Sequence, residues 1–171
     1  MSNKCRLVNM SESMINSEYL NTLNDKTYMK YSRQALKSHS LETVVSFINE
    51  FTPLQKKRFF AFINESNDFT GTCIINFEQN HEIANLGFLI FRNFAGKGYG
   101  SKMLKLLVVE AAKIPSLKFI EIGTHIENLS MIAIAEKAQM ARVKLDGSES
   151  SHGEVVKFRA TIKEVKSYIL L

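Results

Sequence analysis

The chain has 171 residues, of which 45% are hydrophobic and 23% charged, and this composition excludes disordered and fibrous proteins. The length suits a single domain over residues 1–171 that buries about two-thirds of its unfolded surface. No apolar run approaches the ~20 residues that a membrane helix needs, and the first ten residues lack a signal-peptide core. We therefore expect a cytoplasmic protein that does not enter a membrane.

The net charge of +5 is compatible with a nucleic acid, a phosphorylated cofactor or an acidic substrate as partner. Apart from the cluster Lys56-Lys57-Arg58, the basic residues are scattered, and no RNA-binding aromatic signature or Cys/His finger accompanies them. We therefore expect no nucleic-acid partner. Cys5 and Cys73 have no metal-ligand spacing and lie in strand-like apolar contexts, which predicts reduced packing residues and no metal site.

The first third of the chain reads as a strand followed by two helical regions. The strand covers residues 5–9, and the first helical region, residues 11–33, is interrupted at Asn24-Asp25. Ser40 is a suitable N-cap for the second helix, whose apolar residues recur at helical spacing from Val44 to Phe51 before Pro53 ends it. This arrangement predicts one amphipathic helix and one broken one ahead of the main sheet.

Three β-rich runs follow, over residues 59–63, 70–77 and 84–91, and the polar turn of residues 64–68 makes the first two a hairpin. Beyond them, the pattern predicts a helix over 102–113, a strand over 117–123 and a helix over 128–138. Two final strands, over 141–145 and 154–162, are joined by a loop over 146–153. The strand at 117–123 follows its predecessor through a helix, so the two should be parallel. The whole pattern is that of a mixed α+β fold.

The most informative stretch is Phe94 to Ser101, "FAGKGYGS", which lies between a predicted strand and a predicted helix. Glycines at 96, 98 and 100 allow a tight turn that points consecutive N–H groups at one place, next to the positive end of the helix dipole. Phosphate is the ligand that such an anion cradle suits best. The alternative is a flexible glycine turn that binds nothing.

Two common phosphate loops do not fit this stretch. A Walker A loop needs GxxxxGK[ST], which the sequence does not supply. A dinucleotide-binding fingerprint needs GxGxxG followed by parallel βα units, whereas this loop reads GxGxG and follows antiparallel strands.

The passage from Leu86 to Leu107, "LGFLIFRNFAGKGYGSKMLKLL", resembles motif A of the GNAT superfamily of acyl-CoA N-acyltransferases, with the loop at residues 95–100. A second passage, Asn128 to Met140, "NLSMIAIAEKAQM", resembles the motif B helix of the same family. The resemblance is closest to the branch with ribosomal-protein N-terminal and amino-sugar acetyltransferases. It implies an α+β, three-layer fold whose central, mostly antiparallel sheet contains one parallel, splayed strand pair between flanking helices.

The resemblance also implies a donor, acetyl-CoA, whose pyrophosphate suits the amides at the helix N-terminus. The pantetheine arm would lie along one strand of the splayed pair, where a backbone N–H near Leu89 polarises the thioester carbonyl. Asn128 is a candidate contact for the arm, although an Asn at that position is also a good N-cap. The expected donor-binding residues are Phe88, Leu89, Ile90, Ala95, Gly96, Lys97, Gly98, Tyr99, Gly100, Ser101 and Asn128.

Three positions depart from the family pattern. Ala95 stands where Arg or Gln is usual, which removes a side-chain contact but not the backbone cradle. Gln139 replaces the glycine that commonly ends motif B, so the turn there is expected to differ. Ala135 holds the position at which many relatives carry a tyrosine that acts as general acid, so the leaving thiolate would need water or another proton donor.

Acetyl transfer requires a neutral amine, a polarised carbonyl and a protonated leaving sulfur. The candidates for the base are Glu121, expected to face the cleft, and His125, whose ordinary pKa of about 6.5 suits the role. The alternatives are a surface carboxylate and a solvated strand-end histidine. Some members of the family rely on positioning and on deprotonation through water.

The acceptor is expected to contact Tyr28, Tyr31 and Arg33, in a segment able to form a substrate wall. Residues 28–39 resemble the start of relatives that modify amino sugars, which favours an amino-sugar nucleotide over a protein N-terminus. The partners are then acetyl-CoA and a small-molecule or peptide amine. A different class also stays open, a GNAT-like module that binds CoA without catalysis, because Ala135 and the base are unresolved.

Overall fold

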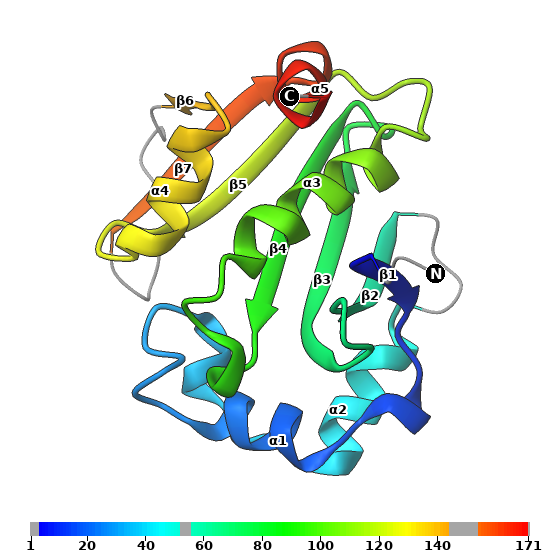
Figure 1. Cartoon of the computed structure of the whole chain (residues 1–171), viewed down its shortest axis with the longest axis vertical. Helices are drawn as coiled ribbons and strands as arrows, with labels where there is room; N and C mark the ends of the chain where they lie inside the picture. The colour runs from blue at the N-terminus through cyan, green and yellow to red at the C-terminus, as the bar shows by residue number, and fades with distance from the viewer. Residues whose placement is uncertain (1–3, 52–55, 144–153, 171) are drawn as a thin grey trace.

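The computed structural model describes residues 4–51, 56–143 and 154–170, and a seven-stranded sheet forms its centre (Figure 1). The strands lie in the order β1-β2-β3-β4-β5-β7-β6. Their bounds are β1 Arg6–Asn9, β2 Lys57–Ile63, β3 Phe69–Glu78, β4 Ile83–Ile90, β5 Phe119–His125, β6 Ala141–Val143 and β7 Val155–Thr161. All neighbours are antiparallel except β4 and β5. The expected mixed α+β fold with one parallel pair is therefore confirmed.

Helices cover both faces of the sheet. The α-helices are α1 Ser17–Asn24, α2 Leu41–Asn49, α3 Tyr99–Ala111, α4 Leu129–Lys137 and α5 Ile162–Leu170, and the short 3-10 helices are η1 Glu12–Met14, η2 Arg33–Leu36 and η3 Arg92–Phe94. Helices α3, α4 and α5 share one hydrophobic core with the sheet, and α1 and α2 share another. Figure 1 shows α3 across β4, and α1 and α2 at the opposite end from α5.

The alternation of side chains assigns each strand residue to one of these faces. In β5, Ile120 and Ile122 are fully buried in the core that contains α3 and α4. Residues 121, 123 and 125 therefore point to the other face of the sheet. The same parity in β4 and β7 places Gly87 and Lys157 on that second face as well, because register partners share a face.

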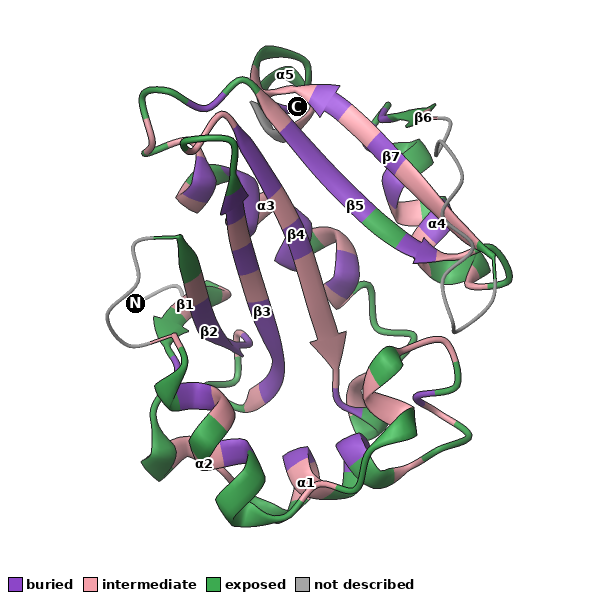
Figure 2. Ribbon diagram, turned by 180° about the vertical axis from the view of Figure 1, so that it is seen from behind, coloured by how far each residue is buried: buried purple, intermediate pink, exposed green. Residues whose placement is uncertain are grey.

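The parallel pairing of β4 with β5 is short. It joins Ile83, Ala84 and Asn85 to Phe119, Ile120 and Glu121, and it ends there although both strands continue. The two strands diverge beyond this point, as the view from behind shows (Figure 2). The sheet thus contains the splayed pair that the resemblance implies.

The sequence missed the last helix and misplaced the start of another. Thr161 ends β7 and also caps α5, since its N–H donates to Glu164 at 2.7 Å and its hydroxyl accepts from the Glu164 N–H at 3.3 Å. This T-x-x-E box was the signal for a helix. Helix α3 begins at Tyr99 rather than at residue 102, because the glycine loop itself starts the helix. Pro53, Leu145 and the loop 146–153 lie outside the described residues.

Within residues 4–51, 56–143 and 154–170, no helix is long and apolar enough to cross a membrane. The same residues contain no cluster of three or more His, Cys, Asp or Glu side chains that could hold a metal ion. Cys73 is fully buried in the core beneath α3, as expected of a packing residue, and Cys5 is half-buried.

Candidate active site

A cleft of about 920 Å³ opens where β4 and β5 diverge. One wall is the end of β4, the other is formed by β5, β7 and the start of α4, and the segment between α1 and α2 closes one side. The lining includes Tyr28, Tyr31, Arg33, Gly87, Phe88, Leu89, Ile90, Ala95, Gly96, Gly123, Thr124, His125, Asn128, Ser130, Met131, Ile134 and Lys157. The cleft therefore gathers residues from six parts of the chain.

Backbone groups of β4 face this cleft without a partner strand. The Phe91 N–H donates to the Thr70 carbonyl at 2.9 Å, so odd-numbered residues of β4 bond to β3 and even-numbered ones point toward β5. After Asn85, the amides of Phe88 and Ile90 have no acceptor among the described residues. The expectation for Leu89 is corrected accordingly, because its amide belongs to the β3 ladder and the cleft-facing donors are its two neighbours.

The glycine loop turns sharply and leaves the start of α3 open. Gly96 and Gly98 both have φ +76°, a conformation that favours glycine, and Gly98 is the N-cap residue. Among the described residues, no side chain or carbonyl accepts from the first amides of α3. Ala95 and Gly96 line the cleft, whereas residues 97–101 do not. The geometry is that of an uncapped helix N-terminus beside the cleft, which suits an anion.

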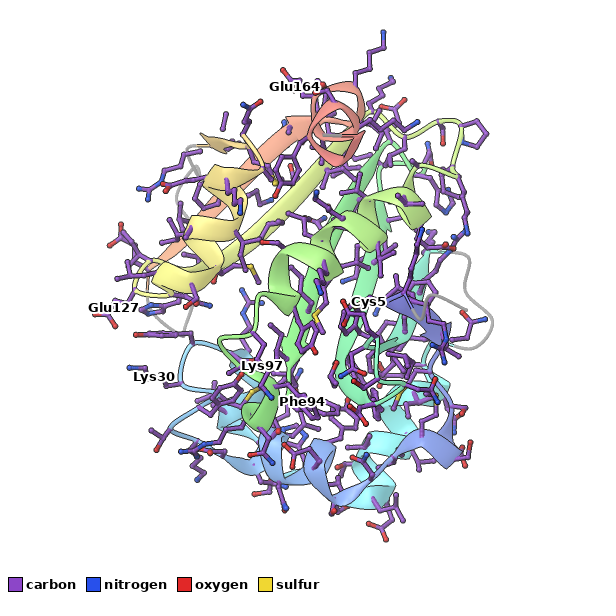
Figure 3. All side chains as sticks on the ribbon, in the orientation of Figure 1. Cys5, Lys30, Phe94, Lys97, Glu127 and Glu164 are labelled. Atoms are coloured by element: carbon purple, nitrogen blue, oxygen red, sulfur yellow. The ribbon has the colours of Figure 1, made fainter. Side chains whose placement is uncertain are left out.

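Side chains in the loop are turned away from the cleft. The Tyr99 hydroxyl accepts from Asn64 Nδ2 at 3.3 Å and its ring packs edge-on against Phe62. Lys97 lies beside Phe94, with its ammonium 5.0 Å from the ring centroid (Figure 3). A Cβ on Gly100 would stand 2.5 Å from Ile134 Cδ1, so the end of the Ile134 side chain packs directly against this glycine of α3. Any contact of the donor with these residues would therefore be made by backbone groups and not by the side chains of Lys97 and Tyr99.

Asn128 caps α4 and lines the cleft at once. Its Oδ1 accepts from the Met131 N–H at 3.3 Å, while its Nδ2 donates to Thr124 Oγ1 at 3.0 Å. Both readings of this residue, as N-cap and as cleft residue, are thus compatible. Ala135, two helical turns after Asn128, is fully buried in the core and does not line the cleft.

All three expected acceptor residues, Tyr28, Tyr31 and Arg33, line the cleft. The Tyr28 hydroxyl donates to the Ile90 carbonyl at 2.9 Å, and burial raises the pKa of this phenol, which keeps it protonated. The carboxylate of Asp25 accepts from the Tyr28 N–H at 2.9 Å. These contacts tie the segment to the splayed end of β4.

His125 also lines the cleft, but its contacts argue against a role as base. Its ring stacks on Tyr31 with centroids 5.3 Å apart, and its Nδ1 accepts from the Glu127 N–H at 3.1 Å. The neutral ring therefore carries its proton on Nε2 and has no free lone pair for an amine proton. The observed contacts of His125 are thus packing against Tyr31 and a hydrogen bond to the backbone of Glu127.

Glu121 is not among the described residues that line the cleft. This corrects the expectation that the Glu121 carboxylate faces the cleft. The side chain is only 1% exposed. Its Oε1 accepts from Arg159 Nε at 2.7 Å and its Oε2 lies 3.0 Å from Lys157 Nζ. Both oxygens are thus occupied by cations, and the surface-carboxylate alternative is wrong too because the group is buried.

Sequence reasoning missed Gly87, Gly123 and Lys157. The two glycines lie at facing positions where β4 and β5 diverge, and a Cβ on either would meet nothing within 4 Å. Glycine inside a strand often marks a close approach by another group, and this was the available signal. Lys157 had no signal of its own, since only its pairing with Gly123 brings it to the cleft.

The family of the chain follows from comparison with known proteins. Residues 7–141 match the model of the acetyltransferase (GNAT) domain. The chain belongs to the GNAT acetyltransferase family. The chemistry of the family is acetyl-CoA-dependent N-acetyl transfer, with acetyl-CoA as the donor. The resemblance to the GNAT superfamily is thereby confirmed.

Solved GNAT structures share this fold over nearly the whole chain. Spermidine N-acetyltransferase from Vibrio cholerae, in complex with CoA and spermine, is 14% identical with a TM-score of 0.80, covering 95% of this chain and 98% of that one. RimL, a ribosomal L7/L12 alpha-N-protein acetyltransferase in complex with CoA, is 17% identical with a TM-score of 0.81 and covers 95% and 97%. The microcin C7 self-immunity acetyltransferase MccE, with acetyl-CoA and AMP, is 16% identical with a TM-score of 0.78 and covers 93% of each chain. No curated protein sequence matches.

Proposed function

We propose that the protein transfers the acetyl group of acetyl-CoA to a primary amine by direct attack in a ternary complex. The observation that carries this proposal is the splay of β4 from β5, with unpaired amides at Phe88 and Ile90. The uncapped start of α3 lies beside it and suits the pyrophosphate of the donor. The pantetheine amides would take the hydrogen bonds that a neighbouring strand would otherwise make.

The residues present suit this reaction without a dedicated base. The amine nitrogen attacks the thioester carbonyl carbon and the C–S bond breaks. The nitrogen loses one proton, and the leaving sulfur gains one to form the free thiol of CoA. An amide of Phe88 or Ile90 stabilises the charge that develops on the carbonyl oxygen. Since Glu121 is ion-paired and His125 has Nδ1 occupied, deprotonation would run through water, with rate gained mainly from positioning.

For the acceptor, we propose an amino-sugar nucleotide. The stacked rings of Tyr31 and His125 provide an apolar wall of the kind that packs against a sugar. Arg33 and Lys157 are the charged residues on the described lining, which includes no carboxylate. This sign of charge disfavours a polyamine and favours an anionic acceptor. MccE, a protein of similar fold, has been crystallised with acetyl-CoA and AMP, which supports an acceptor that carries a nucleotide.

A protein N-terminus is the second candidate. The similarity in fold to RimL, an alpha-N-protein acetyltransferase, favours it. An extended peptide would enter the same side of the cleft, and its terminal amine would reach the same thioester. A peptide acceptor with acidic residues would suit Arg33 and Lys157.

The test combines acetyl-CoA titration by calorimetry with a thiol-release assay over an amine panel. The panel contains amino-sugar nucleotides, acidic and basic peptides with free N-termini, and spermidine. We expect donor binding and turnover of an amino-sugar nucleotide in preference to spermidine. Donor binding without turnover of any amine would favour the non-catalytic module, and no donor binding would overturn the assignment of the loop.

A further inference from the structure

The buried carboxylate of Glu121 takes no part in the proposed reaction, although its burial is unfavourable in free energy. Moving a carboxylate out of water costs several kcal/mol unless cations and hydrogen bonds compensate. Here Arg159 Nε donates at 2.7 Å and Lys157 Nζ lies at 3.0 Å, so two cations surround one anion and the cluster keeps a net positive charge. Of the three, Lys157 is the one on the cleft lining. The consequence of the buried charge is therefore a lysine held in a fixed position at the cleft.

Open space adjoins this lysine. Gly123 is its register partner on β5, and a Cβ there would meet nothing within 4 Å. The Lys157 side chain is 32% exposed, and an ammonium carries three donors, of which Glu121 takes one. A ligand that lies over Gly123 would thus meet an ammonium with donors to spare.

A second cation approaches from the other side of the cleft. Arg33 lines it and has no ion-pair or hydrogen-bond partner among the described residues. Two residues earlier, Tyr31 stacks on His125, which shares the face of β5 that carries Gly123. This stacking anchors the segment that bears Arg33 near the end of β5. Lys157 is on the face of the sheet opposite α3, and Arg33 lies in the segment that this stacking holds against the end of β5.

We propose that Lys157 and Arg33 form a phosphate-binding subsite for the acceptor, and that Glu121 and Arg159 position Lys157 within it. The ligand class is a nucleoside diphosphate, the part of an amino-sugar nucleotide that carries no amine. Charge-assisted hydrogen bonds from lysine and arginine are the usual way of holding such a group. The inference rests on the proposed function and names how the acceptor is held.

The test uses UDP, which has no amine, and protein saturated with CoA so that the donor site is filled. We expect UDP to bind by calorimetry, and Lys157→Met and Arg33→Met each to weaken it about tenfold or more, the loss of one charge-assisted contact. Lys157→Arg should restore most of the affinity. Lys137→Met, an exposed change of equal charge on α4, is the matched control and should leave it unchanged.

Three outcomes would overturn the subsite. The first is that UDP fails to bind the CoA-loaded protein, and the second is that Lys157→Met and Lys137→Met weaken UDP binding equally. The third is that Lys157→Met weakens acetyl-CoA binding instead, which would assign the cation to the donor site. Turnover of an amino-sugar nucleotide with the same KM in Lys157→Met as in the parent would overturn the subsite and leave the transferase in place. Failure of acetyl-CoA itself to bind would count against the proposed function.

Glu121 is tested through kinetics, because it acts through Lys157. Glu121→Gln keeps hydrogen-bond acceptors but loses the charge that fixes the lysine, so KM for the acceptor and Kd for UDP should rise several-fold while kcat changes little. A general base would show the reverse, a large fall in kcat. If Glu121→Gln does not fold, the Lys157 and Arg33 variants still decide the proposal.

Discussion

The backbone N–H of Glu127 donates to Nδ1 of His125 at 3.1 Å, while the ring of His125 stacks on Tyr31. Because the neutral ring has no free lone pair, we expect His125→Phe, which keeps the stacking, to lower kcat less than about tenfold. His125→Ala should raise KM for the acceptor because the stacking is lost. Steady-state kinetics of both variants check this, and a fall of 100-fold or more in kcat for His125→Phe would restore the histidine as base.

The cradle at the start of α3 depends on Gly98, which has φ +76° and no neighbour in the space of a Cβ. We expect Gly98→Val to weaken acetyl-CoA binding about tenfold or more. A β-branched side chain would obstruct the anion, and the backbone would leave its left-handed conformation. Gly98→Asn separates the two effects, because Asn tolerates that conformation. Calorimetry gives both affinities, and an unchanged affinity for Gly98→Val would contradict the cradle.

Two glycines near the cleft should respond oppositely to the same change. Gly71→Ala on β3 would place a Cβ 2.3 Å from the backbone oxygen of Leu89, which cannot easily move, so the free energy of unfolding should fall by about 1–3 kcal/mol. Gly123→Ala meets nothing in the protein and should leave stability unchanged or slightly higher, while KM for the acceptor rises. Urea denaturation and kinetics measure both. A Gly123→Ala variant with unchanged KM would show that no ligand uses that space.

Helix α4 ends in a Schellman turn built on an unusual residue. Gln139 has φ +57°, and the Met140 N–H donates to the Ala135 carbonyl at 3.1 Å. Gln139→Gly should therefore raise the free energy of unfolding by about 0.5–1 kcal/mol. Gln139→Ala relieves no strain and is the control. Equal stability of the glycine and alanine variants in urea denaturation would contradict the argument.

The carboxylate of Asp25 carries a pH-dependent share of stability. Its bond from the Tyr28 N–H, with Arg92 as a second partner, lowers its pKa below the ordinary value. A lowered pKa means that the stabilisation is present above the unfolded pKa and is lost as pH falls through the folded one. Asp25→Asn should therefore be less stable than the parent at pH 7, with the gap closing in acid. Urea denaturation of both proteins at pH 7 and in acid measures this gap, and a gap that does not change with pH would contradict the argument.

Patterns of local sequence were enough to predict most elements and the glycine turn before α3. Apolar periodicity, the Ser40 cap and the glycine loop are signals within a few residues of each other, and the structure confirms each of them. The parallel arrangement of β4 and β5 followed from the helix between them, which is again a local rule.

The sequence alone did not determine where the backbone and side-chain groups of each strand residue point, because this depends on partners far away in the chain. Whether Phe88 or Leu89 presents its amide depends on the register with β3, and the burial of Glu121 depends on cations 36 and 38 positions later. No window of sequence contains both partners. The acceptor side is assembled from such distant pairs, which is why its chemistry needed the structure.

Only three residue pairs, from Ile83 with Phe119 to Asn85 with Glu121, hold β4 against β5. With the proposed placement of its pantetheine arm, acetyl-CoA acts as a removable strand that completes the ladder beyond them. Each catalytic cycle would then close and reopen the middle of the sheet. Amide hydrogen exchange at Phe88 and Gly123 would slow when the donor is bound, and the protein would be most rigid in the state in which it is ready to react.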